Sequence, residues 1–233
     1  MIYLVTSQIE MLDNQVYKII TVKESLDIIK TWDFIQFDTE TSGRDAHLGQ
    51  VLLAQFGSID KSIQIVVDCT TIDMSIYKEV LESKYIIGQN LKFDIQWLYN
   101  YSIKPRKVYD TMIVEQLLYL GYPPEYKNPE FGISYGLQDI AQRRCNVYID
   151  KTVRGQIHWR GIDTTVIQYA AGDVVYLYDI MLSQIAECKA KNCILAAKLE
   201  CDFVPVIAYL EWSGIHLEED KWEAKMANDR KNL

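Results

Sequence analysis

Short apolar runs separated by turn residues fill the first third of the chain and predict strands. Phe34 to Thr39 is expected to be a buried strand that leads into a turn at Ser42-Gly43. Val51 to Phe56 and Ile63 to Val67 have the same character, so the three runs together predict an antiparallel meander. A shorter strand is expected from Tyr85 to Ile87.

Apolar residues at helical spacing predict most of the remaining elements. Helices are expected at Ser75 to Leu81, Leu91 to Tyr101, Thr111 to Leu120, Leu137 to Gln142 and Thr164 to roughly Lys189. Prolines and aromatic residues crowd the stretch from Gly121 to Gly136 and indicate a long irregular loop. A loop of this length inside a compact domain is often functional.

A domain boundary is expected near residue 190, which divides the chain into residues 1–190 and a helical tail, residues 191–233. The tail begins with an amphipathic helix from Leu195 to Trp212 that ends at Gly214. Its apolar stripe is wide enough to be buried in a docking contact with a partner, the alternative being packing against residues 1–190, and consists of Leu199, Phe203, Val206 or Ile207, and Leu210. A second, charged helix is expected to start near Glu219.

Composition places the chain among globular proteins. It has 233 residues, of which 49% are hydrophobic, enough for one large domain or one domain with an appendage. No apolar run approaches the ~20 residues that span a bilayer, and no secretory signal is visible. Five cysteines without paired short spacings fit reduced thiols. These features predict no membrane association and a cytoplasmic location, or the host cytoplasm if the source is viral.

The net charge of −8 argues against a protein that binds duplex nucleic acid non-specifically, because neutralising phosphates needs Lys and Arg. One local basic segment runs from Arg143 to Arg160. Its cations are Arg143, Arg144, Lys151, Arg154 and Arg160, against Asp150 alone. The segment is either a solvated basic face or one wall of a groove for a single strand, with Arg154 and Arg160 on the phosphates.

Two acids at the end of the first predicted strand suggest a metal site. Asp38 and Glu40 are two residues apart, so their side chains share one face of the strand about 7 Å apart. Carboxylates on an otherwise apolar strand need compensation, which Mg²⁺ supplies because it prefers oxygen ligands. The alternative is a pair of exposed acids at a strand end.

Two further acidic positions lie on predicted helices. Asn90 can cap the helix that carries Asp94, one turn along on the same face. Tyr169 and Asp173 are also one turn apart, so the phenol and the carboxylate project together. Each of these arrangements is common in proteins by itself. Only the acids taken together indicate a catalytic site.

Strand Asp-x-Glu, helix Asp and helix Tyr-x-x-x-Asp, in this order, resemble the DEDD superfamily of 3′–5′ exonucleases. The tyrosine makes the resemblance closer to the DEDDy branch, since the histidine branch has His where this chain has Gln168. The resemblance covers roughly Phe34 to Ser183. It implies an α/β, ribonuclease H-like exonuclease fold with a mixed five-stranded sheet flanked by helices.

Two groups within this superfamily each resemble part of the chain. Asp38-Thr39-Glu40-Thr41 resembles the proofreading domain of family A DNA polymerases, whereas Tyr169 to Leu177 resembles ribonuclease D at least as closely. Leu199 to Ile215 resembles the stretch where family A polymerases enter the polymerase domain. The favoured expectation is therefore a DNA proofreading exonuclease that acts on single-stranded 3′ ends, with a family A polymerase domain as partner in the same or a separate chain. An exoribonuclease like ribonuclease D and a non-catalytic nucleic-acid or replisome module remain alternatives.

The resemblance also implies roles for single residues. Asp38, Glu40 and Asp173 would hold one Mg²⁺ or Mn²⁺ ion, and Asp38 with Asp94 a second. Tyr169 would orient the attacking water. The candidates for contacting the terminal nucleotide are Thr39, Gln89 and Asn90. Family A proofreaders often carry an apolar wedge shortly after the first motif, where this chain has Gly43, Arg44 and Asp45.

Overall fold

The computed structural model describes residues 1–8, 10–11, 13–123, 125, 127, 132–149 and 157–231. The strands are β1 Ile2–Val5, β2 Tyr17–Ile19, β3 Phe34–Thr41, β4 Val51–Gly57, β5 Gln64–Asp68, β6 Tyr85–Gly88 and β7 Val108–Asp110. The helices are α1 Val22–Lys30, the 3-10 turn η1 Met74–Tyr77, α2 Lys78–Ser83, α3 Leu91–Tyr99, α4 Thr111–Leu118, α5 Leu137–Cys145, α6 Ile157–Arg160, α7 Thr164–Asp173, α8 Leu177–Ala190, α9 Ile194–Ser213 and α10 Glu219–Lys231. Among the described residues, no helix is both long and apolar enough to cross a membrane.

The strands form one mixed sheet in the order β2-β1-β5-β4-β3-β6-β7. β3, β4 and β5 are antiparallel neighbours, which confirms the predicted meander, and β6 and β7 continue in parallel beyond β3. The expectation of five strands is wrong, because β1 pairs in parallel with both β5 and β2 and extends the sheet to seven. These two strands have only four and three residues, too few to show an alternating pattern.

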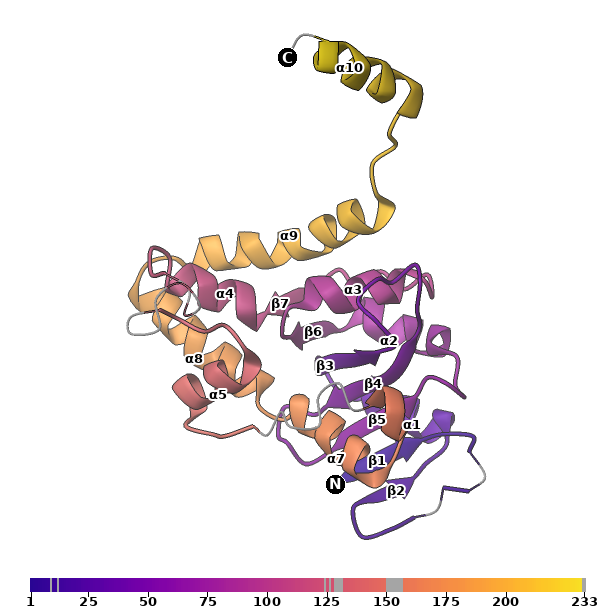
Figure 1. Cartoon of the computed structure of the whole chain (residues 1–233). Coiled ribbons are helices and arrows are strands. Elements are labelled where there is room, and N and C mark those ends of the chain that lie inside the picture. The colour runs from indigo at the N-terminus through magenta and orange to yellow at the C-terminus, as the bar shows by residue number, and fades with distance from the viewer. Residues whose placement is uncertain are drawn as a thin grey trace.

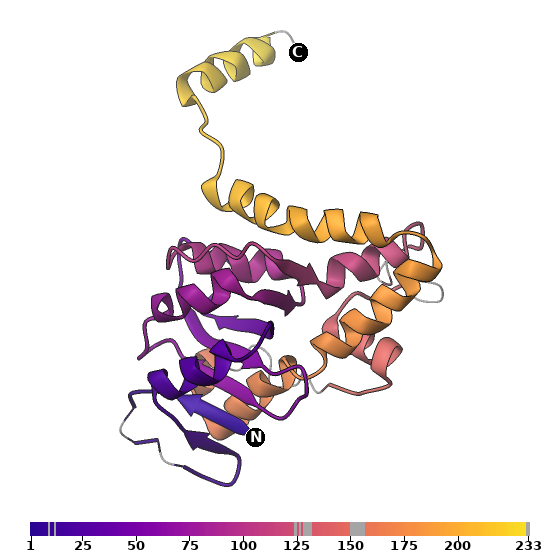
Figure 2. The same ribbon diagram turned by 180° about the vertical axis from the view of Figure 1, so that it is seen from behind.

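The alternation of side chains along β3 and β4 divides the core between the two faces of the sheet. On one face, Phe37 and Phe56 pack in a cluster that also contains residues of α1, α2, α3 and α9. On the other face, Leu53 packs with Val166 and Ala170 of α7. Helices therefore cover both faces (Figures 1 and 2), as the α/β, ribonuclease H-like expectation requires.

The predicted long helix from Thr164 to Lys189 is two helices. α7 ends at Asp173, and α8 begins at Leu177 with a new direction (Figure 1). The amide of Tyr178 donates to the side-chain Oε1 of Gln36 at 2.8 Å, so a residue of β3 satisfies an amide in the first turn of α8. This distant contact cannot be recognised from helical spacing, which continues across the break.

α9 packs along α3, α4 and β7, but not through the stripe predicted from the sequence. The buried positions are Ala197, Cys201, Val204 and Ala208, whereas Leu199, Phe203, Val206 and Leu210 are exposed. Small residues on the buried side let the helix lie close to its neighbours. α10 has no buried residue and stands apart from the rest of the molecule in both views (Figures 1 and 2).

Candidate active site

Three carboxylates meet where β3 passes the end of α7. Asp38 and Glu40 project from the same face of β3, and Asp173 is the last residue of α7. One ligand oxygen from each acid lies within 4.8 Å of those of the other two. Asp173 is 3% exposed, and the other two are half-buried. Three acidic groups this close repel one another strongly unless a cation lies between them.

Gly57 lets α7 approach the sheet closely enough to deliver Asp173. A Cβ atom at Gly57 would lie 2.3 Å from the backbone oxygen of Val174 and 3.1 Å from the Val174 Cγ2. Real Cβ atoms do not come this close to backbone atoms, so any side chain at this position would force the end of α7 away. The glycine thus sets the distance between Asp173 and the acids of β3.

Tyr169 lies one turn before Asp173 on α7, beside the same carboxylates. Burial raises the pKa of its phenol far above the usual value, and the negative charges of Asp173, Glu40 and Asp38 raise it further. The phenol therefore stays protonated at neutral pH. It is suited to donate a hydrogen bond and unsuited to act as a base.

Asp94 reaches the same pocket from the opposite face of the sheet. Thr39, between the two acids of β3, points away from them and donates a hydrogen bond of 2.6 Å to the Asp94 carboxylate. Burial raises the pKa of Asp94 to about 7, and the bond from Thr39 opposes that rise. The four acids singled out from the sequence thus line one pocket, although Asp94 lies outside the compact group of three.

Asp110 is a positioning residue that the sequence analysis missed. Its buried carboxylate accepts the amides of Asn90 and Leu91 at 3.0 and 2.7 Å, and that of Met112 at 2.9 Å. It therefore caps α4 and also fixes the first turn of α3, which carries Asp94. The prediction that Asn90 caps α3 with its side chain is wrong: its backbone is left-handed (φ 57°), and the side chain makes no capping bond. An Asp directly before the apolar run of α4 was the available signal.

The pocket has a volume of about 1040 Å³. It is lined by Asp38, Thr39, Glu40, Thr41, Gly43, Arg44, Gln89, Asn90, Phe93, Asp94, Met112, Tyr135, Gly136, Leu137, Gln138, Asp139, Tyr169 and Asp173. These residues include five carboxylates, but Arg44 is the one Arg or Lys among them. This many oxygen donors suit hard divalent cations. Without such cations the carboxylates would repel a polyanionic ligand.

The three polar residues expected to meet a nucleotide all line the pocket, but the side chains of Thr39 and Gln89 and the backbone amide of Asn90 also make structural hydrogen bonds. Gln89 donates to the backbone oxygen of Tyr135 at 2.8 Å and accepts from the hydroxyl of Thr111. Thr39 is engaged with Asp94, and the amide of Asn90 with Asp110. Contact of these residues with a substrate stays a prediction.

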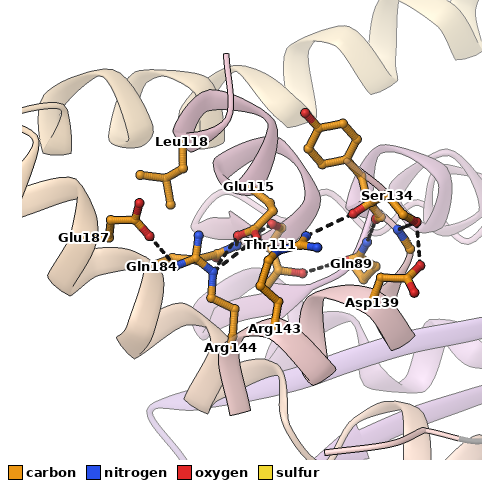
Figure 3. Close-up of polar contacts among 12 residues, drawn as sticks. Gln89, Thr111, Glu115, Leu118, Ser134, Asp139, Arg143, Arg144, Gln184 and Glu187 are labelled. Carbon is orange, nitrogen blue, oxygen red and sulfur yellow. Dashed lines mark hydrogen bonds and ion pairs between the residues drawn. The ribbon is translucent and has the colours of Figure 1, made fainter. Parts of the chain in front are cut away.

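The basic segment is not a continuous wall. Arg143 and Arg144 turn inward to the fully buried Glu115, with N–O distances of 2.8 Å each (Figure 3). Arg160 pairs with Asp163 at 3.0 Å and is not among the pocket-lining residues. Arg154 lies outside the described residues. The interpretation as a groove wall is therefore wrong for Arg143 and Arg144, because a buried carboxylate requires their charges.

The ion pairs around Glu115 also support one wall of the pocket. Gln184 donates to Glu115 at 2.8 Å, and Arg143 donates to the backbone oxygen of Ser134 at 3.0 Å (Figure 3). The next residue, Tyr135, receives the bond from Gln89 described above. The network thus ties α4, α5 and α8 to the segment 135–139 that lines the pocket.

Clustered carboxylates on a central strand of an α/β sheet and on the helix packed beside it, with a tyrosine held protonated next to them, define the class of metal-dependent nucleases. The model of the 3′–5′ exonuclease family matches residues 15–184, and the chain belongs to this metal-dependent family. The stretch includes all five residues predicted to be catalytic: Asp38, Glu40, Asp94, Tyr169 and Asp173.

One curated relative is DNA polymerase I of Aquifex aeolicus (strain VF5), which is 28% identical over 162 residues. The match covers 68% of this chain and 25% of that protein, so the chain spans about a quarter of its length. Among solved structures, Brucella melitensis NrnC has a TM-score of 0.70 and 20% identity, covering 91% of this chain and 94% of NrnC. Escherichia coli RNase D, an exoribonuclease involved in structured RNA processing, has a TM-score of 0.66 and 22% identity, covering 86% and 50%. At these identities the two structures show that the fold is shared.

Proposed function

We infer that this chain removes nucleotides from the 3′ ends of single-stranded DNA, as the proofreading activity of a family A polymerase does. The observation that carries the inference is the convergence of Asp38, Glu40 and Asp173 within 4.8 Å in a pocket that also contains Asp94 and Tyr169. The preference for DNA is supported by the sequence relative, a DNA polymerase I that matches across most of the chain.

Two divalent ions, Mg²⁺ or Mn²⁺, fit this set of donors, and a form of NrnC with bound Mg²⁺ shares the fold, with a TM-score of 0.67. Asp38, Glu40 and Asp173 would hold one ion, and Asp38 with Asp94 the other. Ions bound there would acidify a water molecule and neutralise charge on the phosphate. The described part of the chain offers no histidine in the pocket lining, so all protein ligands would be oxygens.

The side chains around the carboxylates supply the remaining functions. The protonated Tyr169 would donate to the attacking water or to a phosphate oxygen and fix its position. Thr39 holds the Asp94 carboxylate in one orientation through its 2.6 Å bond. Gln89 and Asn90, which line the pocket, would meet the sugar or base of the terminal nucleotide, and Arg44 a phosphate.

A second candidate substrate is a short oligonucleotide or RNA. NrnC matches this chain across nearly its whole length, and one of its structures contains bound pGG, with a TM-score of 0.68. The exonuclease core of this chain could act on such a ligand without a polymerase partner.

Initial rates on four substrates distinguish the candidates. Single-stranded DNA, the matching RNA, pGG and its deoxy counterpart are compared at equal concentration, first with Mg²⁺ and then with Mn²⁺. The proposal expects the DNA strand to be degraded fastest. Faster cleavage of RNA or of pGG would overturn the preference for DNA, and binding without cleavage in either metal would indicate a non-catalytic module.

The polymerase partner is proposed to meet residues 191–233. Leu199, Phe203 and Leu210 form an exposed apolar face on α9, and α10 exposes Trp222 and Met226 one turn apart. An isolated helix of this length is marginal in water. In the monomer, hydrogen exchange should therefore be fast over residues 219–231 and slow in α9. Protection in α10 equal to that of the sheet strands would make the tail part of this domain and reject the proposed docking role.

A further inference from the structure

Gln55 is a fully buried side chain whose two polar atoms have no partner among the described residues. It lies in β4 with 0% exposure, and within the described part of the chain neither Nε2 nor Oε1 makes a hydrogen bond. A buried carboxamide is costly without partners, and most such groups in folded proteins are bonded. An unpaired one beside a functional site therefore needs an explanation.

The position of Gln55 in the sheet points to its partner. It is directly opposite Asp38 in the antiparallel register, so the two side chains emerge on the same face with Cβ atoms about 5 Å apart. Its neighbours along β4 on that face, Leu53 and Gly57, and its partner on β5, Val66, are apolar, and the diagonal neighbours on β3 are Gln36 and Glu40. The polar residue paired directly with Gln55 across the two strands is therefore Asp38, the acid expected to serve both ions.

Gln36 shows what a purely structural glutamine looks like on this face. It lies two residues before Asp38 and is also fully buried. Its Nε2 donates to the backbone oxygen of Ser58 at 2.7 Å, and its Oε1 accepts the amide of Tyr178 at 2.8 Å. Both ends of the Gln36 side chain are therefore hydrogen-bonded within the fold, whereas the equally buried Gln55 makes no such bond with the described residues.

We propose that Gln55 is a positioning residue for metal binding, which rests on the two-ion site proposed above. In the metal-loaded protein its Nε2 donates to one oxygen of Asp38 and fixes the rotation of that carboxylate. The remaining lone pairs then face the ions. Partners of metal ligands orient them in this way, and losing one typically weakens metal affinity 10- to 100-fold.

Gln55→Met tests the proposal, with Gln36→Met as the matched control. The metal-free fold of Gln55→Met should be as stable as the wild type, since no bond is lost. Calorimetry should show Mn²⁺ binding weakened about 10- to 100-fold. The cleavage rate should recover at high Mn²⁺. Gln36→Met should do the opposite: its unfolding temperature falls by about 4 °C or more, because Tyr178 and Ser58 lose their partner, while Mn²⁺ affinity stays unchanged.

Three results would overturn the assignment. The first is wild-type Mn²⁺ affinity in Gln55→Met. The second is a loss of rate that high Mn²⁺ does not rescue. The third is failure of both Gln55→Met and the smaller Gln55→Leu to fold, which would make the residue structural. If the wild-type protein itself neither binds Mn²⁺ nor cleaves DNA, the proposed function fails independently of any Gln55 variant.

Discussion

The hydroxyl of Thr39 donates a hydrogen bond of 2.6 Å to the carboxylate of Asp94 and so joins β3 to α3 directly behind the acids of the pocket. Thr39 stands between Asp38 and Glu40 in the sequence, but it points to the other face of the sheet. One strand therefore supplies two acids on one face and orients a third from the other. This arrangement explains how the acids come from both sides of the sheet.

The raised pKa of Asp94 predicts how stability depends on pH. Without metal, the folded state holds this proton up to about pH 7, whereas the unfolded chain releases it near pH 4. The stabilisation is therefore complete below about pH 4 and is lost as the pH rises through 7. Urea unfolding in chelator should show a free energy of unfolding that falls by up to about 1.4 kcal/mol per pH unit across this window.

Asp94→Asn removes this contribution and serves as the control. The charge of Asp110 contributes to the raised pKa of Asp94, and burial raises the pKa of Asp110 itself to about 6, so the comparison reports Asp94 together with its interaction with Asp110. The variant should lose less stability between pH 5 and pH 7 than the wild type does. Identical pH slopes for the two proteins would contradict the assignment.

Tyr169→Phe should leave metal binding nearly unchanged and slow cleavage about 10²-fold. The phenol is proposed to hold a water or a phosphate oxygen, not a metal ion, and its raised pKa excludes a role as base at neutral pH. Mn²⁺ calorimetry beside single-turnover rates measures the two effects separately. Lost Mn²⁺ affinity, or an unchanged rate, would count against this role.

Gly57→Ala should destabilise the protein by about 1–3 kcal/mol and slow cleavage, because the new Cβ would displace the end of α7 that carries Asp173. Gly172→Ala is the stability control: its Cβ would meet no atom within 4 Å, and alanine favours a helix by up to about 1 kcal/mol. Chemical denaturation compares the two variants. Wild-type stability and activity in Gly57→Ala would mean that α7 does not need this close contact.

Arg44→Ala should weaken the binding of single-stranded DNA and flatten the plot of log affinity against log salt by about 0.7, the contribution of one phosphate contact. Arg44 is the one Arg or Lys among the described residues that line the pocket. Arg160→Ala should flatten the slope less, since its guanidinium also pairs with Asp163. An unchanged salt slope in Arg44→Ala would contradict the phosphate contact of Arg44. An unchanged slope in Arg160→Ala would favour the interpretation of the segment from Arg143 to Arg160 as a solvated basic face.

The acids could be found from the sequence because their arrangement depends on short-range geometry. The spacing of Asp38 and Glu40 along a strand, and of Tyr169 and Asp173 along a helix, fixes which side chains share a face. The resemblance to the DEDD superfamily then indicated that these separate local patterns form one site. The structure places all of them in one pocket, as expected.

Features that depend on distant contacts could not be predicted in the same way. The first turn of α8, after the break from α7, is bonded to Gln36, which is 142 residues from its partner Tyr178. The inward turn of Arg143 depends on the burial of Glu115, 28 residues away. α9 carries apolar residues on more than one side. Helical spacing alone therefore selected the large residues Leu199 and Phe203 for the buried stripe, whereas smaller residues on another side are the buried ones.

The most direct test of the account follows a 5′-labelled single strand of DNA over time, with the wild type and Asp38→Ala side by side. The wild type with Mg²⁺ should produce a ladder that shortens one nucleotide at a time from the 3′ end, and chelator should stop it. Asp38→Ala should fold normally and leave the strand intact, and adding Glu40→Ala should change little more because the acids act as a unit. A near wild-type rate in folded Asp38→Ala, or degradation that persists in chelator, would contradict the central claim.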